Sequence, residues 1–152
     1  ANVIYKSKTG WSFSGYLTKI EFSKDMMINS SGNLSTINGS TCFPLDLIPT
    51  DLKVCALNVN TCRAYCASPY KRKGHNGWDI PVKYSLNVPQ GNYIVFSLTE
   101  YDRYKKLQGY YTTFVRCGMN YNCRTNTIIP ISTKIDKKRN NINPCDWGQN
   151  SY

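Results

Sequence analysis

The fold class follows from the stretch at 82–91, Val-Lys-Tyr-Ser-Leu-Asn-Val-Pro-Gln-Gly, and from the run at 92–99, Asn-Tyr-Ile-Val-Phe-Ser-Leu-Thr. Apolar side chains at 82, 84, 86 and 88 alternate with polar ones, which is typical of a strand with one buried and one exposed face. Pro89 removes a backbone donor and Gly91 is free to take positive φ, so we expect a turn there. The sequence predicts a β-hairpin over 82–99.

Segments of similar character flank this hairpin. We expect strands at 11–22, with a bulge at Gly15, at 109–117 and at 127–135, because β-branched and aromatic residues dominate there. Residues 23–50 lose the pattern and are rich in Asn, Ser and Gly, which predicts a long loop or insertion. A chain of 152 residues fits one domain. The prediction is all-β: a single antiparallel β-sandwich of about seven strands.

Residues 52–68 predict another hairpin, with its turn at 60–62. Cys55 and Cys66 are equidistant from that turn, so an antiparallel pairing would place them opposite each other and favour a cross-strand disulfide. Cys117 and Cys123 stand at the two ends of a short polar loop, which a local disulfide would close.

Three of the seven cysteines remain, Cys42, Cys62 and Cys145. We favour a pair between Cys42 and Cys145, with Cys62 free. None of the spacings forms a CxxC pair, so disulfides are a better interpretation than zinc. They indicate an oxidising compartment, either the periplasm or the outside of the cell. We find no signal sequence and no apolar run of roughly 18 residues that could span a membrane.

The formal charge is +10, from 19 Lys and Arg against 9 Asp and Glu. This excess favours an anionic surface or ligand, such as a phospholipid head group, lipopolysaccharide or an acidic glycan, and nucleic acid stays open as a less favoured partner. If successive strands reverse direction, three basic loops at 70–78, 101–106 and 137–139 meet at one end of the sandwich. Their cations are Lys71, Arg72, Lys73, Arg103, Lys105, Lys106, Lys137, Lys138 and Arg139, and the aromatic residues beside them are Tyr70, Trp78, Tyr101 and Tyr104.

Signals for catalysis and cofactors are weak. His75 is the only histidine, and its loop lacks the second titratable partner that most hydrolytic schemes need. Asp46, Asp51 and Asp79 lack the close carboxylate spacing of a calcium loop. We find no nucleophile elbow or phosphate-binding glycine loop. We therefore expect no enzymatic activity, no metal and no cofactor.

An ordered series of short motifs resembles a group of small exported Gram-negative bacterial proteins, which look like single carboxypeptidase-regulatory-like or prealbumin-like β-sandwich domains. The resemblance covers residues 52–147. It implies export and a prealbumin-like or Ig-like sandwich, with cysteines that recur at 55, 66, 117 and 123, and it implies no particular reaction. The motifs are Val54-Cys-Ala-Leu-Asn58, Tyr65-Cys66, Val88-Pro-Gln-Gly-Asn-Tyr93, Tyr110-Tyr-Thr-Thr-Phe-Val-Arg-Cys-Gly118, Cys123 and Ile142-Asn-Pro-Cys-Asp-Trp147.

Two classes of function stay open. The first is a secreted or periplasmic binding module, monomeric and non-enzymatic, whose basic loops dock on an anionic partner. The second is a small basic secreted nuclease or toxin that would use His75 and a lysine. A protein–protein adhesion domain that uses sheet edges or residues 23–50 is a further alternative.

Overall fold

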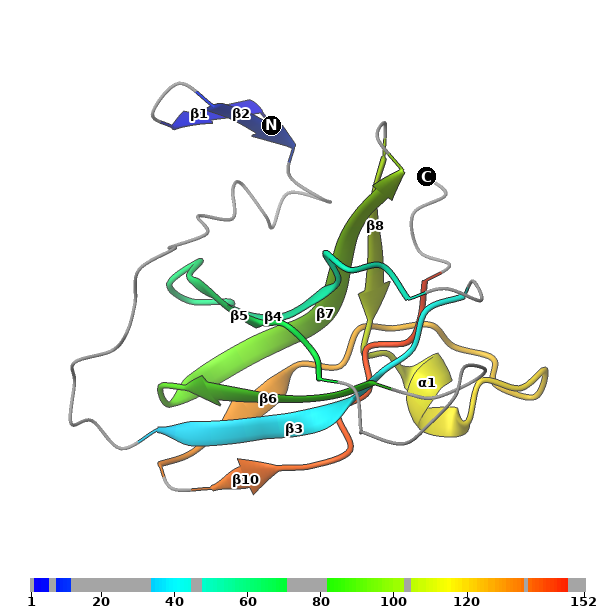
Figure 1. The fold of residues 1–152 in the computed structure, drawn as a ribbon. Helices are drawn as coiled ribbons and strands as arrows, with labels where there is room; N and C mark the ends of the chain where they lie inside the picture. The colour runs from blue at the N-terminus through cyan, green and yellow to red at the C-terminus, as the bar shows by residue number, and fades with distance from the viewer. Residues whose placement is uncertain are drawn as a thin grey trace.

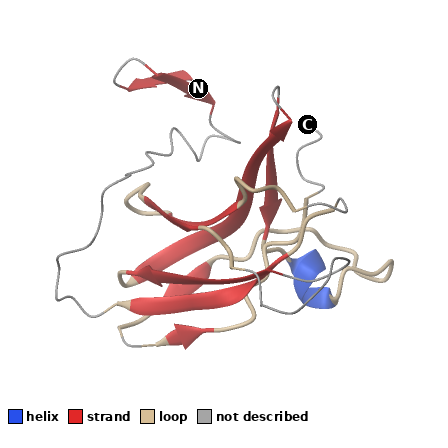
Figure 2. Ribbon diagram, in the orientation of Figure 1, coloured by secondary structure: helices blue, strands red, loops and turns tan. Residues whose placement is uncertain are grey.

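The computed structural model describes residues 2–5, 8–11, 34–44, 48–70, 82–102, 105–135 and 137–147, with residues 2–5, 8–11, 101–102 and 105–106 described by their backbone alone. Strands dominate, as Figures 1 and 2 show, and the all-β prediction is confirmed. The elements are β1 (Asn2–Tyr5), β2 (Lys8–Trp11), β3 (Ser35–Thr41), β4 (Lys53–Asn58), β5 (Ala64–Ala67), β6 (Val82–Val88), β7 (Gly91–Asp102), β8 (Lys105–Tyr110), α1 (Thr113–Cys117), β9 (Ile131–Thr133) and β10 (Lys138–Arg139).

The strands form two main sheets. One has the order β10-β3-β6, in which β10 runs parallel to β3 and β6 antiparallel to it. The other has the order β5-β4-β7-β8, with β9 also paired to β7, and all its pairs are antiparallel. β1 and β2 pair with each other in a separate hairpin.

The two main sheets share one apolar core. Ile37, Tyr84 and Leu86 from the first sheet cluster with Val54 and Val95 from the second. Burial in β6 alternates residue by residue, as its sequence predicts, and β7 follows it at the predicted place. These two strands are not paired with each other, so the predicted hairpin over 82–99 is wrong.

The turn between β6 and β7 instead carries the chain from one sheet to the other. Val88 pairs with Ser35 of β3, whereas Gly91 pairs with Thr133 of β9. Alternation reports only that one face of a strand is buried, and burial against a facing sheet gives the same period as burial within a hairpin. A sequence that predicts two strands joined by a turn therefore does not show whether the strands pair in a hairpin or belong to two different sheets.

The interval assigned to a loop at 23–50 contains β3, a central strand. Ile37 is fully buried, and Ser35 and Thr41 are buried polar residues on the same side of the strand. Gly39 lies against the C-terminal segment, where a β-carbon would come within 1.9 Å of the Ile142 carbonyl oxygen. The strand was missed because Ser, Thr, Asn and Gly outnumber its single large apolar residue.

The expected strand at 109–117 is wrong beyond Tyr110. β8 ends at Tyr110, and α1 begins after Thr112, whose hydroxyl accepts a hydrogen bond from the Val115 N–H. Gly118 ends the helix in the left-handed region, at φ 101°. A Thr at the N-cap and a Gly just past the last turn are the usual helix boundaries, and here they override the strand propensity of the residues between them.

The expected long strand at 127–135 is shorter than predicted. Only Ile131–Thr133 forms a strand, and Ile128 makes an isolated bridge to Thr112. The expected strand at 11–22 falls almost wholly outside the described residues, although β2 reaches Trp11.

The C-terminal segment packs back on the body. Ile142 is buried, and its carbonyl accepts a hydrogen bond from the Tyr84 hydroxyl at 2.6 Å. Trp147 packs edge-on against Phe43 and donates its indole N–H to the Cys42 carbonyl at 2.8 Å.

The three predicted disulfides are confirmed. They join Cys42 to Cys145, Cys55 to Cys66 and Cys117 to Cys123, and Cys62 is free and exposed. Within the described part of the chain, no helix is long and apolar enough to cross a membrane.

Candidate functional site

Many of the candidate anion-binding residues lie outside the described part of the chain. The structure says nothing of Lys71, Arg72, Lys73, Trp78, Arg103 and Tyr104, nor of His75, Asp46 and Asp79. Tyr101, Lys105 and Lys106 are placed by their backbone, at the end of β7 and the start of β8. Lys137 precedes β10, and Lys138 and Arg139 form it.

The structure separates two basic segments that we expected to lie together. Asp102 pairs with Lys105 at one end of β7, whereas Gly91, at the other end, pairs with Thr133 just before the turn into β10. A strand of that length spans on the order of 35 Å. Figure 1 shows the end of β7 and the start of β8 at the top of the molecule, far from β10. The prediction that the basic loops converge is therefore wrong for these two.

The reason lies in the topology. The prediction assumed that each strand reverses beside its predecessor, so that alternate connections share an end. The crossing between sheets after β6 and the helix after β8 break that sequence of reversals. As a result, the basic segment at 137–139 lies at the same end of the molecule as the turns at 60–62 and 89–91. A hydrogen bond from the Val59 N–H to the Asn92 carbonyl joins those two turns.

Acidic groups accompany the cations at the Asp102 end. Asp51 accepts hydrogen bonds from the Thr99 hydroxyl and from the Glu100 N–H, both at 2.7 Å. These bonds, the Thr99 one foremost, lower the pKa of Asp51, so its carboxylate is charged at neutral pH. Asp51 thus binds the Thr99 hydroxyl and the backbone of β7. With Glu100 and Asp102 it reduces the positive potential there.

The basic residues around β10 form a different kind of surface. We call Lys134, Ile135, Lys137, Lys138 and Arg139 the basic turn. All five are exposed, and Ile135 exposes 43% of its area. Asp136, between them in sequence, is outside the described residues. Among the described acids, Asp51, Glu100 and Asp102 lie at the far end of β7, and Asp146 is buried beside Thr112.

The backbone of the basic turn is held firmly. The Lys137 N–H donates to the Lys134 carbonyl at 3.2 Å, which closes the turn, and the Ser35 hydroxyl donates to the same carbonyl. The Lys137 carbonyl accepts from the Thr36 N–H at 3.1 Å. The exposed side chains of the basic turn are therefore attached to a hydrogen-bonded backbone at the edge of a sheet.

Arg139 has a second role within this turn. Its Nε donates to the Ser132 carbonyl at 2.8 Å, which ties β10 to the end of β9 in the other sheet. β10 is the outermost strand of its sheet, so this bond helps to hold an edge that has a strand on one side only.

Two residues of the basic turn were missed from the sequence. Lys134 and Ile135 were assigned to the expected strand at 127–135. The strand ends at Thr133, so both side chains are exposed. The run Lys-Ile-Asp-Lys-Lys-Arg at 134–139 is the signal that could have found them.

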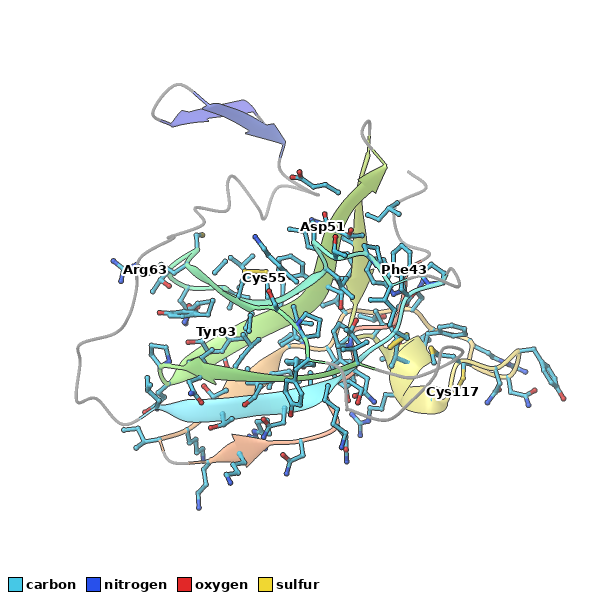
Figure 3. All side chains as sticks on the ribbon, in the orientation of Figure 1. Phe43, Asp51, Cys55, Arg63, Tyr93 and Cys117 are labelled. Carbon is cyan, nitrogen blue, oxygen red and sulfur yellow. A yellow bond between two sulfur atoms is a disulfide. The ribbon has the colours of Figure 1, made fainter. Side chains whose placement is uncertain are left out.

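The aromatic candidates do not join this surface in the described structure. Tyr70 bridges to Lys83 near the start of β6, away from the Val88 end that lies beside the basic turn. Tyr121 is 95% exposed and was not singled out from the sequence. Figure 3 shows the labelled Cys117, which begins the loop of Tyr121, on the opposite side of the molecule from Arg63 and the 60–62 turn.

No group of three His, Cys, Asp or Glu side chains that could hold a metal ion occurs among the described residues. No family model, curated protein or solved structure matches the chain significantly, so the functional argument rests on the residues of this chain.

Proposed function

We propose that this chain is a secreted or periplasmic, non-enzymatic binding module that docks on an anionic lipid surface through the basic turn. In this proposal the two facing sheets form a disulfide-stapled β-sandwich of the prealbumin-like or Ig-like type. Three disulfides support a folding environment that is oxidising, because such bonds do not persist in a reducing cytosol. The phosphates of a phospholipid or lipopolysaccharide are the partners that the charge favours.

The observation that carries the proposal is the combination of charge and exposed apolar surface in one turn whose backbone is hydrogen-bonded to β3. Lysines on an edge strand also serve to prevent strand pairing between molecules, and that role alone would explain Lys138. It does not explain Ile135, which exposes 43% of its area among four cations. An anionic lipid surface accommodates both, because its head groups attract lysine and its acyl boundary takes up an aliphatic side chain.

Vesicle binding tests the proposal. The variant Lys134→Gln/Lys137→Gln/Lys138→Gln removes three cations from the basic turn and leaves Arg139 bonded to Ser132. The matched control Lys53→Gln/Arg63→Gln/Lys83→Gln removes the same charge from three exposed positions elsewhere. At about 1 kcal/mol per cation, the first variant should bind vesicles of phosphatidylglycerol and phosphatidylcholine about 100-fold more weakly at low salt. The control should lose far less.

Two further arms identify the partner. Ile135→Ser should weaken vesicle binding several-fold while leaving binding to heparin or single-stranded RNA unchanged, because only lipid offers an apolar boundary. Binding by the parent chain should also weaken as salt rises. Equal losses in the two triple variants, tighter binding to RNA than to vesicles, or no vesicle binding at low ionic strength would each refute the proposal.

A further inference from the structure

A second exposed surface is built on the disulfide between Cys117 and Cys123. We define residues 116–124, Arg-Cys-Gly-Met-Asn-Tyr-Asn-Cys-Arg, as the stapled loop. We propose that this loop binds a protein partner that offers an apolar pocket bordered by carboxylates. The proposal does not depend on lipid docking by the basic turn.

The loop is ordered before any partner arrives. The N–H groups of Gly118 and Met119 donate to the carbonyls of Val115 and Phe114 at 3.1 and 3.0 Å, which is the Schellman pattern at the end of a helix. The Cys123 N–H donates to the Asn120 carbonyl at 2.9 Å, and the disulfide closes the ring. A loop fixed in this way loses little conformational entropy on binding.

Folding does not account for the two large side chains at the tip of the loop. Tyr121 is 95% exposed and Met119 is 46% exposed. Met119 also has φ 54°, a left-handed conformation that favours Gly or Asn. Tyr121 has almost no buried surface to lose, and Asn would suit the backbone at residue 119 better than Met does, so the exposed apolar surface is available for a partner.

The charged residues within and beside the stapled loop in the sequence are all basic. Arg116 and Arg124 flank the loop and are exposed, and the sequence contains no Asp or Glu from residue 103 to residue 135. Guanidinium groups form paired hydrogen bonds with carboxylates. A second copy of this chain, with its net charge of +10, is an unfavourable partner for such a surface.

A protein fits this loop better than a membrane does. Tyr, Met and Arg are the residue types enriched at protein interfaces, and Tyr and Arg are frequent among the residues that dominate binding. Asn120 and Asn122 flank Tyr121. The Asn120 Oδ1 accepts from the Asn122 N–H at 2.9 Å, but the NH₂ groups of both side chains would lose their water partners on burial in lipid. A protein surface can supply those partners.

The loop also lies away from the basic turn. Figure 1 shows the chain after α1 projecting at the right of the molecule, whereas β10 lies at the lower left. The two surfaces can therefore be occupied at the same time, and variants of one surface should leave the other unaffected.

Phage display of random peptides on the immobilised full chain tests the proposal, with counter-selection on Tyr121→Ser/Met119→Asn. Selected peptides should combine an aromatic or aliphatic residue with Asp or Glu. When synthesised, they should bind Tyr121→Ala at least about 30-fold more weakly, the scale of an interface hot spot. Arg116→Gln/Arg124→Gln should cost about 10-fold at low salt and less at high salt.

The triple variant of the basic turn is the matched control, and it should leave peptide binding unchanged. Thermal unfolding of Tyr121→Ala should match that of the parent, because the side chain has few contacts to lose. Failure to enrich peptides, or peptides that bind Tyr121→Ala as tightly as the parent, would overturn the proposal. So would a Tyr121→Ala variant that weakens vesicle binding as much as the basic-turn variant does, since the loop would then be a lipid anchor.

Discussion

The Thr112 hydroxyl donates a hydrogen bond to the Asp146 carboxylate at 2.7 Å, and both residues are buried. The same hydroxyl accepts from the Val115 N–H, so one side chain joins the start of α1 to the C-terminal segment. We expect Asp146→Ala to lower the free energy of unfolding by about 2 kcal/mol, because it leaves the Thr112 hydroxyl buried without an acceptor.

Asp146→Asn is the matched control for that prediction. Its amide oxygen can still accept from Thr112, so the loss should be about 1 kcal/mol or less. Urea denaturation of the two variants beside the parent measures both values. Equal losses of about 2 kcal/mol would mean that the charge of the carboxylate matters and not its acceptor oxygen. No loss in either variant would mean that the backbone pairing of Asp146 with Tyr110, which neither substitution removes, is sufficient to hold the segment.

The elements that could be predicted from the sequence are those whose signal is local. The hairpin of β4 and β5 follows from a turn and from cysteines at equal distances on either side of it, and Cys55 indeed pairs with Cys66. The partner of β6 could not be predicted, because its alternation is satisfied equally by β3 and by β7. β3 itself has a polar composition and is a strand because Ile37, Ser35 and Thr41 are buried between neighbours that lie far away in sequence.

The same distinction applies to the candidate sites. A cluster of basic residues within one turn, such as Lys137 and Lys138, is visible in the sequence. Whether it meets the cations near Lys105 depends on strand order, which local patterns do not contain. The disulfide that closes the stapled loop could be predicted from the sequence. The exposure of Tyr121 could not, because it depends on the direction that α1 gives the chain after β8.

Gly39 tests the position of β3 in the sheet. A β-carbon there would meet the Ile142 carbonyl oxygen at 1.9 Å, a distance that requires backbone movement. We expect Gly39→Ala to cost about 2 kcal/mol or more, as overpacking does in a filled interior. Thermal denaturation should show a clear drop in Tm. An unchanged Tm would contradict the close approach of the C-terminal segment to β3.

Tyr84 predicts a loss of stability in alkaline solution. Burial, with a smaller effect of Tyr111, raises the pKa of Tyr84 well above its usual value, so the folded protein holds this proton more tightly than the unfolded chain does. The corresponding stability is present below about pH 10 and is lost as pH rises further, by up to about 1.4 kcal/mol per pH unit.

Tyr84→Phe separates the hydrogen bond from the titration. At pH 7 the variant should be less stable by about 1–2 kcal/mol, because the buried Ile142 carbonyl loses its donor at 2.6 Å. Above pH 10 the difference from the parent should narrow. Tyr93 and Tyr110, whose pKa values burial also raises, should keep part of the alkaline slope in the variant. If the difference in free energy of unfolding between the variant and the parent grew with pH, the prediction would be contradicted.

Asp51 predicts the opposite pH dependence. Hydrogen bonds from Thr99 and then Glu100 lower its pKa below the ordinary 3.8 in the folded protein. The stability that they supply is present above that pH and is lost as pH falls through the lower folded pKa. Asp51→Asn should lower the free energy of unfolding by about 1 kcal/mol at pH 7, a modest value because the side chain is exposed. The difference from the parent should vanish at a pH low enough to protonate Asp51 in the parent. A difference that persists at low pH would contradict this account.

Cys62 is the one cysteine outside the three disulfides, and its exposure makes it the site of any thiol chemistry on the native chain. It lies in the turn between β4 and β5 at φ 55°, where its N–H donates to the Asn58 carbonyl at 2.9 Å. We expect one thiol per chain to react with a maleimide under native, non-reducing conditions, and peptide mapping should place the label on Cys62. Cys62→Asn should abolish labelling and raise the free energy of unfolding by about 0.5–1 kcal/mol, because Asn tolerates the left-handed conformation better. A label on Cys55 or Cys66 would contradict their disulfide and the register of β4 and β5, and a label on Cys117 would contradict its bond to Cys123.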